Sequence, residues 1–242
     1  MLLDSLLAIA ALVSASIAAV TGFGIGSLLT PVLALRAGTQ LAVAAVAIPH
    51  FVGTLQRFWI LRRHVDRRVL LGFGVTSAVG GLVGALLHTW IASRALNLVF
   101  GSLLILAAVS EFTGWMTRVR WSRRAAWIAG AVSGALGGLV GNQGGIRSAS
   151  MLGFEVPKES FVATATAIGL CVDLARLPVY VATQGAQMAG LWPQILIATI
   201  GVVIGTVLGT RLLARVPQQA FRRVIAIVLL LLGIYMFGQG IG

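Results

Sequence analysis

Long apolar runs are the feature of this chain that most limits its fold. Eight runs carry little or no charge, at about residues 5–21, 41–61, 69–88, 95–113, 125–141, 160–182, 189–210 and 222–238. Most are close to the roughly 20 residues that an α-helix needs to cross the hydrocarbon layer of a bilayer. Of the 242 residues, 58% are hydrophobic and only 10% are charged, which is more apolar surface than one soluble core buries. The sequence therefore predicts an all-α, polytopic membrane protein.

The pattern of residues excludes other classes of protein. An outer-membrane β-barrel alternates apolar and polar residues, whereas AIVLLLLGIYMF (226–237) is a continuous apolar block. The net charge of +12 is concentrated in short arginine clusters between apolar runs, which leaves no soluble face for nucleic acid. The single cysteine, Cys171, lies inside an apolar run and indicates no disulfide framework. The first residues, MLLDSLLAIA, lack the basic start of a cleaved signal peptide, and we expect them in the mature protein.

The arginine clusters indicate how the chain crosses the membrane, because short cytoplasmic loops collect Lys and Arg. Three connections carry four arginines each, at 62–68, 118–124 and 211–223. The connection 88–94 has only Arg94, and the loop predicted at TQGAQ (183–187) has no charge. With the three rich connections in the cytoplasm, the two poor ones are predicted to lie outside.

Two glycine-rich breaks interrupt this pattern. TGFGIGS (21–27) and GNQGG (141–145) each lead into a shorter apolar piece. The stretch 125–154 is long for one crossing of a layer about 30 Å thick and short for two. With 118–124 inside and 183–187 outside, the chain between them crosses the membrane an odd number of times, and the run 160–182 supplies one crossing. The stretch 125–154 therefore has to enter and leave on the cytoplasmic side.

The same reasoning predicts a first hairpin at 5–35 that enters and leaves on the outside, with both termini outside as well. The chain then has two inverted repeats, each a Gly-broken helix or re-entrant hairpin followed by three transmembrane helices. An offset of 119 residues aligns Gly22 with Gly141, Gly26 with Gly145 and Arg57 with Arg176, and an offset of 121 aligns Gly80 with Gly201, Gly84 with Gly205 and Arg94 with Arg215. The predicted units are residues 1–113, a basic cytoplasmic connection at 114–124, and residues 125–242.

The breaks are also the predicted site. A break inside the bilayer leaves backbone N–H and C=O groups that lipid cannot satisfy, so it persists only inside protein or beside water. Freed N–H groups at the start of a half-helix favour an anion. We therefore predict an anion site where the two breaks meet near the middle of the membrane. The predicted substrate contacts are Gly22, Gly24, Gly26, Ser27, Gly141, Asn142, Gln143, Gly144, Gly145, Arg147 and Ser148.

The two breaks resemble known signature segments. TGFGIGSLLTPVLAL (21–35) and GNQGGIRSASMLGF (141–154) are similar to the two signature segments of the sulfite exporter TauE/SafE family, also called the toluene sulfonate uptake permeases. The resemblance covers essentially the whole chain. It implies a multi-pass protein of the bacterial inner membrane that moves small, mostly sulfur-containing anions such as sulfite, sulfonates or thiosulfate. The second segment departs from the more purely Gly-rich form by carrying Asn142, Gln143 and Arg147.

Four further residues in the apolar runs are candidates for gating or coupling. Asp173 and Arg176 are three residues apart on one helix face, so they form either a structural ion pair or a site of anion contact or proton coupling. Arg57 either anchors its helix at the interface or acts in the mechanism. His50 is either a neutral core histidine or a group that titrates near neutral pH. Arg147 likewise either contacts substrate or only reaches an interface or a carbonyl.

These observations predict a secondary transporter for small, sulfur-containing organic or inorganic anions that works by alternating access. A passive anion channel is the alternative, and flux saturation or counterflow would distinguish the two. An enzyme is not expected, because Cys171 has no obvious base partner and His50, His64 and His88 are scattered along the chain. No cofactor or metal is expected. The partners are a small anion and the lipid bilayer, and the sequence leaves open a coupling proton and a homo-oligomer.

Overall fold

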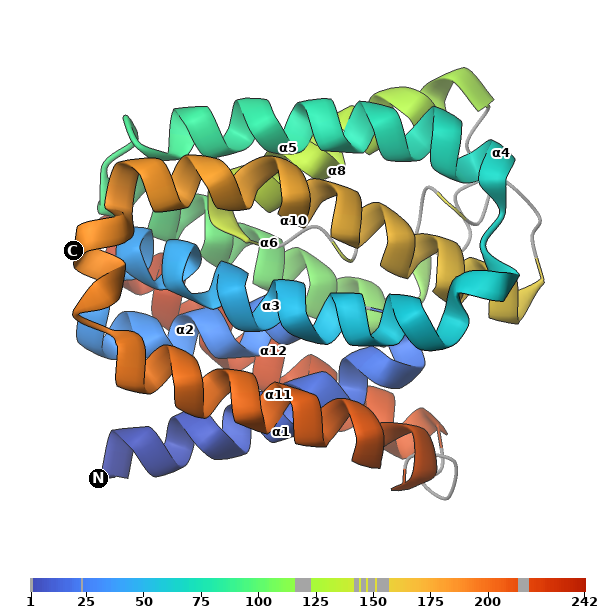
Figure 1. The fold of residues 1–242 in the computed structure, drawn as a ribbon. Helices are drawn as coiled ribbons and strands as arrows, with labels where there is room; N and C mark the ends of the chain where they lie inside the picture. The colour runs from blue at the N-terminus through green and yellow to red at the C-terminus, as the bar shows by residue number, and fades with distance from the viewer. Residues whose placement is uncertain are drawn as a thin grey trace.

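The computed structural model describes residues 2–22, 24–115, 123–141, 144, 147, 151, 157–212 and 218–242 (Figure 1). All regular elements among these residues are helical. They are α1 (Leu2–Thr21), α2 (Ile25–Ala37), α3 (Thr39–Leu61), the 3-10 turn η1 (Arg62–His64), α4 (Arg67–Val69), the π-helical turn η2 (Leu70–Gly74), α5 (Val75–His88), α6 (Ser93–Thr113), α8 (Arg123–Val140), α10 (Lys158–Ala189), α11 (Trp192–Leu212) and α12 (Gln218–Ile241). The predicted all-α class is confirmed.

The described helices have the surface of a membrane protein. Six spans in the described part of the chain are long and apolar enough to cross a bilayer: Leu2–Ala19, Thr39–His64, Arg67–His88, Ser93–Thr113, Glu159–Ala189 and Trp192–Gly209. Large apolar side chains cover the outside, such as Val75, Val79 and Leu86 on one face of α5, whereas charged side chains such as Asp173 and Arg176 are buried. A soluble protein has the opposite distribution, since its charged groups face water. The chain is therefore a multi-pass membrane protein.

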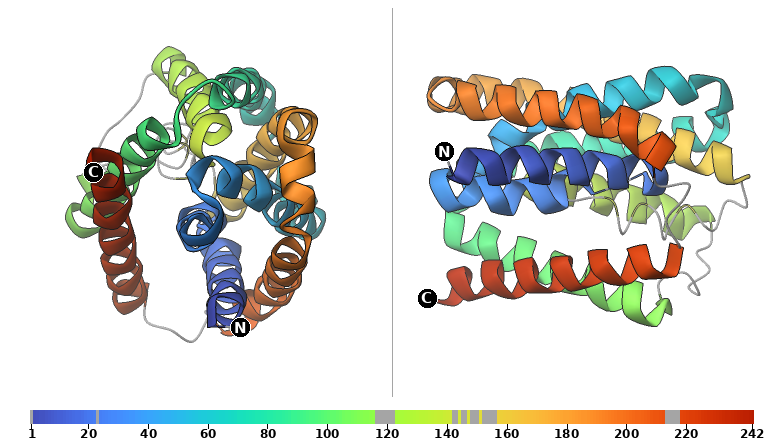
Figure 2. Two further views of the ribbon diagram at one scale, coloured as in Figure 1. Left: turned by 90° about the vertical axis from the view of Figure 1, so that its left-hand side faces the viewer. Right: turned by 90° about the horizontal axis from the view of Figure 1, so that it is seen from below.

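Close helix pairs build the molecule around α3 and α10. α1 packs along α11, α5 along α8 and α6 along α12, while α3 packs on α10 (Figure 2). Glycines allow the first two pairs to approach closely: a Cβ atom at Gly84 would lie 2.0 Å from the carbonyl oxygen of Ala135, and one at Gly205 would lie 2.2 Å from that of Leu12. Small residues at such contacts are the usual means by which helices associate in lipid.

The first hairpin enters and leaves at one end of the molecule. α2 folds back along α1, and Nη1 of Arg36 at its end lies 3.7 Å from Oδ1 of Asp4 at the start of α1. The start of α1 and the end of α12, which carry the two chain termini, lie at this end of the molecule, and α4 lies at the opposite end (Figure 1). Arg94, at the start of α6, donates a hydrogen bond to the carbonyl of Gly242. Which end faces the cytoplasm stays a prediction.

One predicted loop is wrong. TQGAQ (183–187) belongs to α10, which runs for 32 residues to Ala189 and ends at Gly190. Gln and Ala have high helix propensity, and the single Gly185 costs only about 1 kcal/mol in a helix interior, so nothing in this segment stops the helix. Because about 20 residues suffice to cross the hydrocarbon layer, α10 is long enough to extend beyond it.

Candidate functional site

The first break is a short non-helical joint between α1 and α2. Gly22 has a φ of 80° and Gly24 a φ of 130°, conformations that residues with a side chain rarely adopt. No side chain caps the start of α2, and its residues from Ile25 to Leu33 are all buried. The first turn of α2 therefore presents its backbone to the protein interior.

The second break begins at Gly141, directly after α8, and touches the first. Gly141 has a φ of 73°, and a Cβ atom at Gly26 would lie only 2.3 Å from its carbonyl oxygen. Gly144 and Arg147 are buried as well. The structure thus brings Gly26 against Gly141 and Arg147 against Gly22 in the protein interior, with Ser27 buried next to Gly26. Gly24 is half-buried at the start of α2. Asn142, Gln143, Gly145 and Ser148 lie outside the described residues.

Arg147 joins the two breaks. Its side chain is 3% exposed, and Nη2 donates a hydrogen bond of 3.0 Å to the carbonyl oxygen of Gly22. Its Nε and Nη1 have no hydrogen-bond partner in the described part of the chain. Gly169 on α10 makes room for this guanidinium, because a Cβ atom there would lie 2.9 Å from Nη1. Arg147 is therefore covered by protein and pairs with a carbonyl, and two of its nitrogens have no hydrogen-bond partner among the described residues.

Arg57 is a second buried guanidinium beside Arg147. It is 4% exposed, so its side chain is covered by protein. Its Nη2 donates a hydrogen bond of 3.2 Å to Oγ1 of Thr54, and its Nε and Nη1 have no partner among the described residues. A Cβ atom at Gly169 would also lie 3.7 Å from Cγ2 of Thr54, so Thr54 and Arg147 flank the same glycine. The positive charges of Arg57 and Arg147 repel each other.

Asp173 and Arg176 form the predicted contact, within one turn of α10. Nε and Nη2 of Arg176 lie 3.0 Å and 2.8 Å from Oδ1 of Asp173, and Nη1 donates a hydrogen bond of 2.7 Å to the carbonyl of Gly137. Nδ1 of His50 on α3 lies 2.7 Å from the other carboxylate oxygen, Oδ2. All three nitrogens of Arg176 and both oxygens of Asp173 therefore have partners, in contrast to Arg57 and Arg147.

Sequence reasoning missed three contributors to this region. Thr54 and Gly169 shape the surroundings of the two guanidinium groups, and the hydroxyl of Tyr180 donates to the carbonyl of Gly138 at the end of α8. Thr54 precedes Arg57 by three residues and so shares its helix face, which is a signal that the sequence does carry. Nothing local distinguishes Gly169 or Tyr180 from other residues of an apolar helix.

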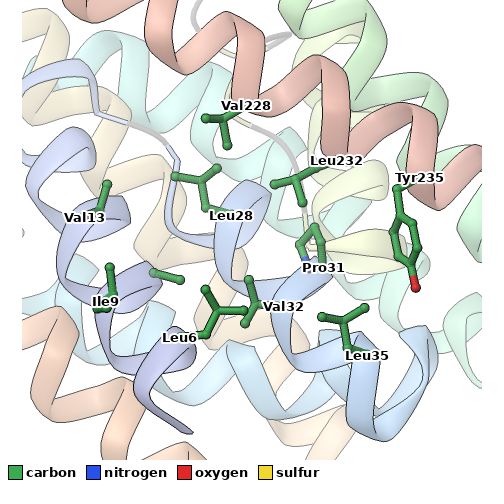
Figure 3. A pocket seen from close by; sticks show the side chains of 11 residues that line it. Leu6, Ile9, Val13, Leu28, Pro31, Val32, Leu35, Val228, Leu232 and Tyr235 are labelled. Carbon is green, nitrogen blue, oxygen red and sulfur yellow. The ribbon is translucent and has the colours of Figure 1, made fainter. Parts of the chain in front are cut away.

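A separate groove lies on the lipid-facing side, between α1, α2 and α12. It encloses about 330 Å³ and is lined by apolar side chains including Leu6, Ile9, Leu28, Pro31 and Leu232, with Tyr235 at one edge (Figure 3). No charged side chain of the described residues lines it. An anion would therefore lose its hydration in this groove without gaining a partner, and the groove is not part of the candidate site.

The fold and the buried arginines define a polytopic helical membrane protein with two touching backbone breaks in its interior. Residues 6–236, nearly the whole chain, match the sulfite exporter TauE/SafE family. The chain belongs to this family of membrane transporters, as its two signature segments predicted. No curated protein and no solved structure matches the chain.

Proposed function

We propose that this protein carries small sulfur oxyanions across the bacterial inner membrane and binds them between the two breaks, with Arg57 and Arg147 as the main contacts. The observation that carries the proposal is the pair of buried guanidinium groups, each with two nitrogens that lack a partner in the described chain. An unpaired charge in the membrane interior costs several kcal/mol unless an opposite charge or water compensates it. A bound anion would supply the opposite charge that the two guanidinium groups need.

The low polarity of the surroundings makes such contacts strong. Two opposite unit charges 4 Å apart attract each other by about 4 kcal/mol at an effective dielectric constant near 20, against about 1 kcal/mol in water. Guanidinium groups also match the planar spacing of oxygens in oxyanions, because each presents several N–H groups in a fixed geometry. The family to which the chain belongs supports sulfur oxyanions as the class of substrate.

The contact between the breaks supports the proposal of alternating access. Arg147 donates to the carbonyl of Gly22 through Nη2, while its Nε and Nη1 have no partner among the described residues, so an anion bound to these two nitrogens would draw the guanidinium away from the carbonyl. Replacement of the Gly22 carbonyl by the anion as the partner of Arg147 would loosen one break from the other and open the site toward one side. A carrier of this kind binds substrate in each cycle, unlike a passive channel. The pair of Asp173 and His50, beside the arginines, is the candidate site for a coupled proton.

Transport by purified protein in liposomes tests the proposal. Uptake of labelled sulfite should saturate with concentration and should show counterflow, which a channel would not produce. Arg147→Gln should lower the anion affinity by at least about tenfold, because it removes a charge from a site of low polarity. Arg94→Gln is the matched control, since Arg94 is exposed and its interactions are screened by water and salt. Equal effects of the two substitutions would contradict a substrate site at Arg147.

A further inference from the structure

Among the described residues, the buried cluster around the breaks carries two positive charges in excess. Arg57, Arg147 and Arg176 are all buried, and arginine stays protonated in proteins. Among the buried residues of the described chain, Asp173 is the only carboxylate. Its Oδ1 accepts from Arg176 and its Oδ2 lies 2.7 Å from Nδ1 of His50, and its charge also attracts Arg57 and Arg147 through space, but one negative charge offsets only one of the three positive charges.

The remaining carboxylates of the chain are few and, where described, lie elsewhere. The sequence holds six acidic residues in all. Asp4 contacts Arg36 and Gln194 near the start of α1, and Asp66 caps α4 at the opposite end of the molecule. Glu111 lies in the last turn of α6, and Glu159 is exposed in the first turn of α10. Glu155 lies outside the described residues and is the one carboxylate that the experiment below has to test.

A monoanion between Arg57 and Arg147 would leave one buried positive charge without compensation, whereas a dianion would leave none. Burial of an uncompensated charge is strongly unfavourable, so the two ligands differ by a full charge in a region of low polarity. The four guanidinium nitrogens that have no partner among the described residues also require several acceptor oxygens close together, which a compact oxyanion provides.

We propose that the site selects compact oxyanions with two negative charges over monoanions of the same size. This inference rests on the proposed function, because it assumes that the substrate lies between Arg57 and Arg147. It assigns sulfite in its fully deprotonated form, thiosulfate and sulfate to the preferred class. Simple alkyl sulfonates such as methanesulfonate, which carry one negative charge in all, belong to the disfavoured class.

Sulfate and methanesulfonate are the matched probes. Both are tetrahedral sulfur oxyanions of similar size that keep their charge near neutral pH, and they differ by one negative charge. Binding to the purified protein is measured by calorimetry at constant ionic strength. Sulfate should bind at least about tenfold more tightly than methanesulfonate, a difference of about 1.4 kcal/mol in binding free energy. Arg57→Gln should remove most of this preference, while Arg57→Lys, which keeps the charge, should retain it.

The outcomes separate the two proposals. Equal affinities of the parent protein for the two probes would overturn the selection of dianions and leave the anion site standing. Failure to bind sulfate, sulfite, thiosulfate and methanesulfonate would overturn the proposed function itself. Glu155→Gln should leave the ratio of the two affinities unchanged. A rise in that ratio of tenfold or more would show that Glu155 already neutralises one arginine, and the inference would be wrong.

Discussion

At the residue scale, Asp173 and Arg176 differ from Arg57 and Arg147 because every charged-group nitrogen or oxygen of the pair has a partner. Arg176 donates to Oδ1 at 3.0 Å, and Nδ1 of His50 lies 2.7 Å from Oδ2. A buried ion pair is often no more stabilising than a well-packed apolar pair of the same volume. Removal of one partner is costly all the same, since the other charge stays buried.

We therefore expect Asp173→Asn to lower the free energy of unfolding by about 3 kcal/mol, because Arg176 keeps its charge in the interior. The double variant Asp173→Asn/Arg176→Gln should recover much of this loss. Thermal unfolding of the parent, both single variants and the double variant in detergent measures the coupling. The opposite result is equally informative: an Asp173→Asn protein of unchanged stability that exchanges substrate without accumulating it would assign Asp173 to proton coupling.

At the scale of elements, the two breaks depend on glycine where their backbones touch. The Cβ atom of an alanine at position 26 would lie 2.3 Å from the carbonyl oxygen of Gly141, so one of the two breaks would have to move. Backbone yields less easily than the end of a flexible side chain. The contact between the breaks thus depends on a position that only glycine can occupy without displacement.

Gly26→Ala should abolish transport and destabilise the protein by about 1–3 kcal/mol through overpacking. Gly238→Ala in α12 is the matched control, because nothing lies within 4 Å of the added Cβ atom. Transport in liposomes and thermal unfolding of both variants provide the comparison. Normal transport by Gly26→Ala would mean that the breaks do not need their close contact.

The helix pairs bear on the predicted repeat at the same scale. α1 packs along α11 and α8 along α5, so each pair joins the first helix of one predicted half to a helix of the other. The register differs by about one helical turn. The predicted alignment pairs Leu12 with Ala131 and Gly80 with Gly201. Gly80 approaches the carbonyl of Ala131, but the residue that approaches the carbonyl of Leu12 most closely is Gly205, four residues after Gly201. The inverted repeat stays a prediction, and exact symmetry between the halves is not what the helix contacts indicate.

At the scale of the whole molecule, the ends of the helices divide into two groups. Asp4, Arg36, Arg94 and Gly242 lie toward one end, and α4 with its arginines lies at the other. Because cytoplasmic loops collect Lys and Arg, the end with α4 is predicted to face the cytoplasm.

Single-cysteine labelling tests this orientation in a Cys171→Ala background. In intact cells, an impermeant thiol reagent should label Gln187→Cys near the end of α10 and should not label His64→Cys in η1, since both positions are exposed but face opposite sides. Lysed cells, in which both variants should react, are the control. Labelling of His64→Cys in intact cells would reverse the predicted topology.

Local features of the sequence determined much of the protein. Apolar runs of about 20 residues predicted the helices, because the bilayer sets the length of an apolar span. Glycines at 22, 24 and 141 predicted where α1 and α8 stop, since a positive φ favours a residue without a side chain. The spacing of Asp173 and Arg176 predicted their contact, which the structure confirms. Each of these properties depends on neighbours in the chain.

Only the tertiary structure decided what surrounds the site. Arg57 lies near an arginine cluster in the sequence, yet the packing of α3 against α10 buries it beside Arg147. Gly169 makes room for the guanidinium of Arg147, which donates a hydrogen bond to the carbonyl of Gly22, far away in the chain. These contacts depend on how helices cross and rotate against one another. A run of apolar residues leaves that rotation undetermined in lipid, because apolar faces all around a helix are equally soluble there.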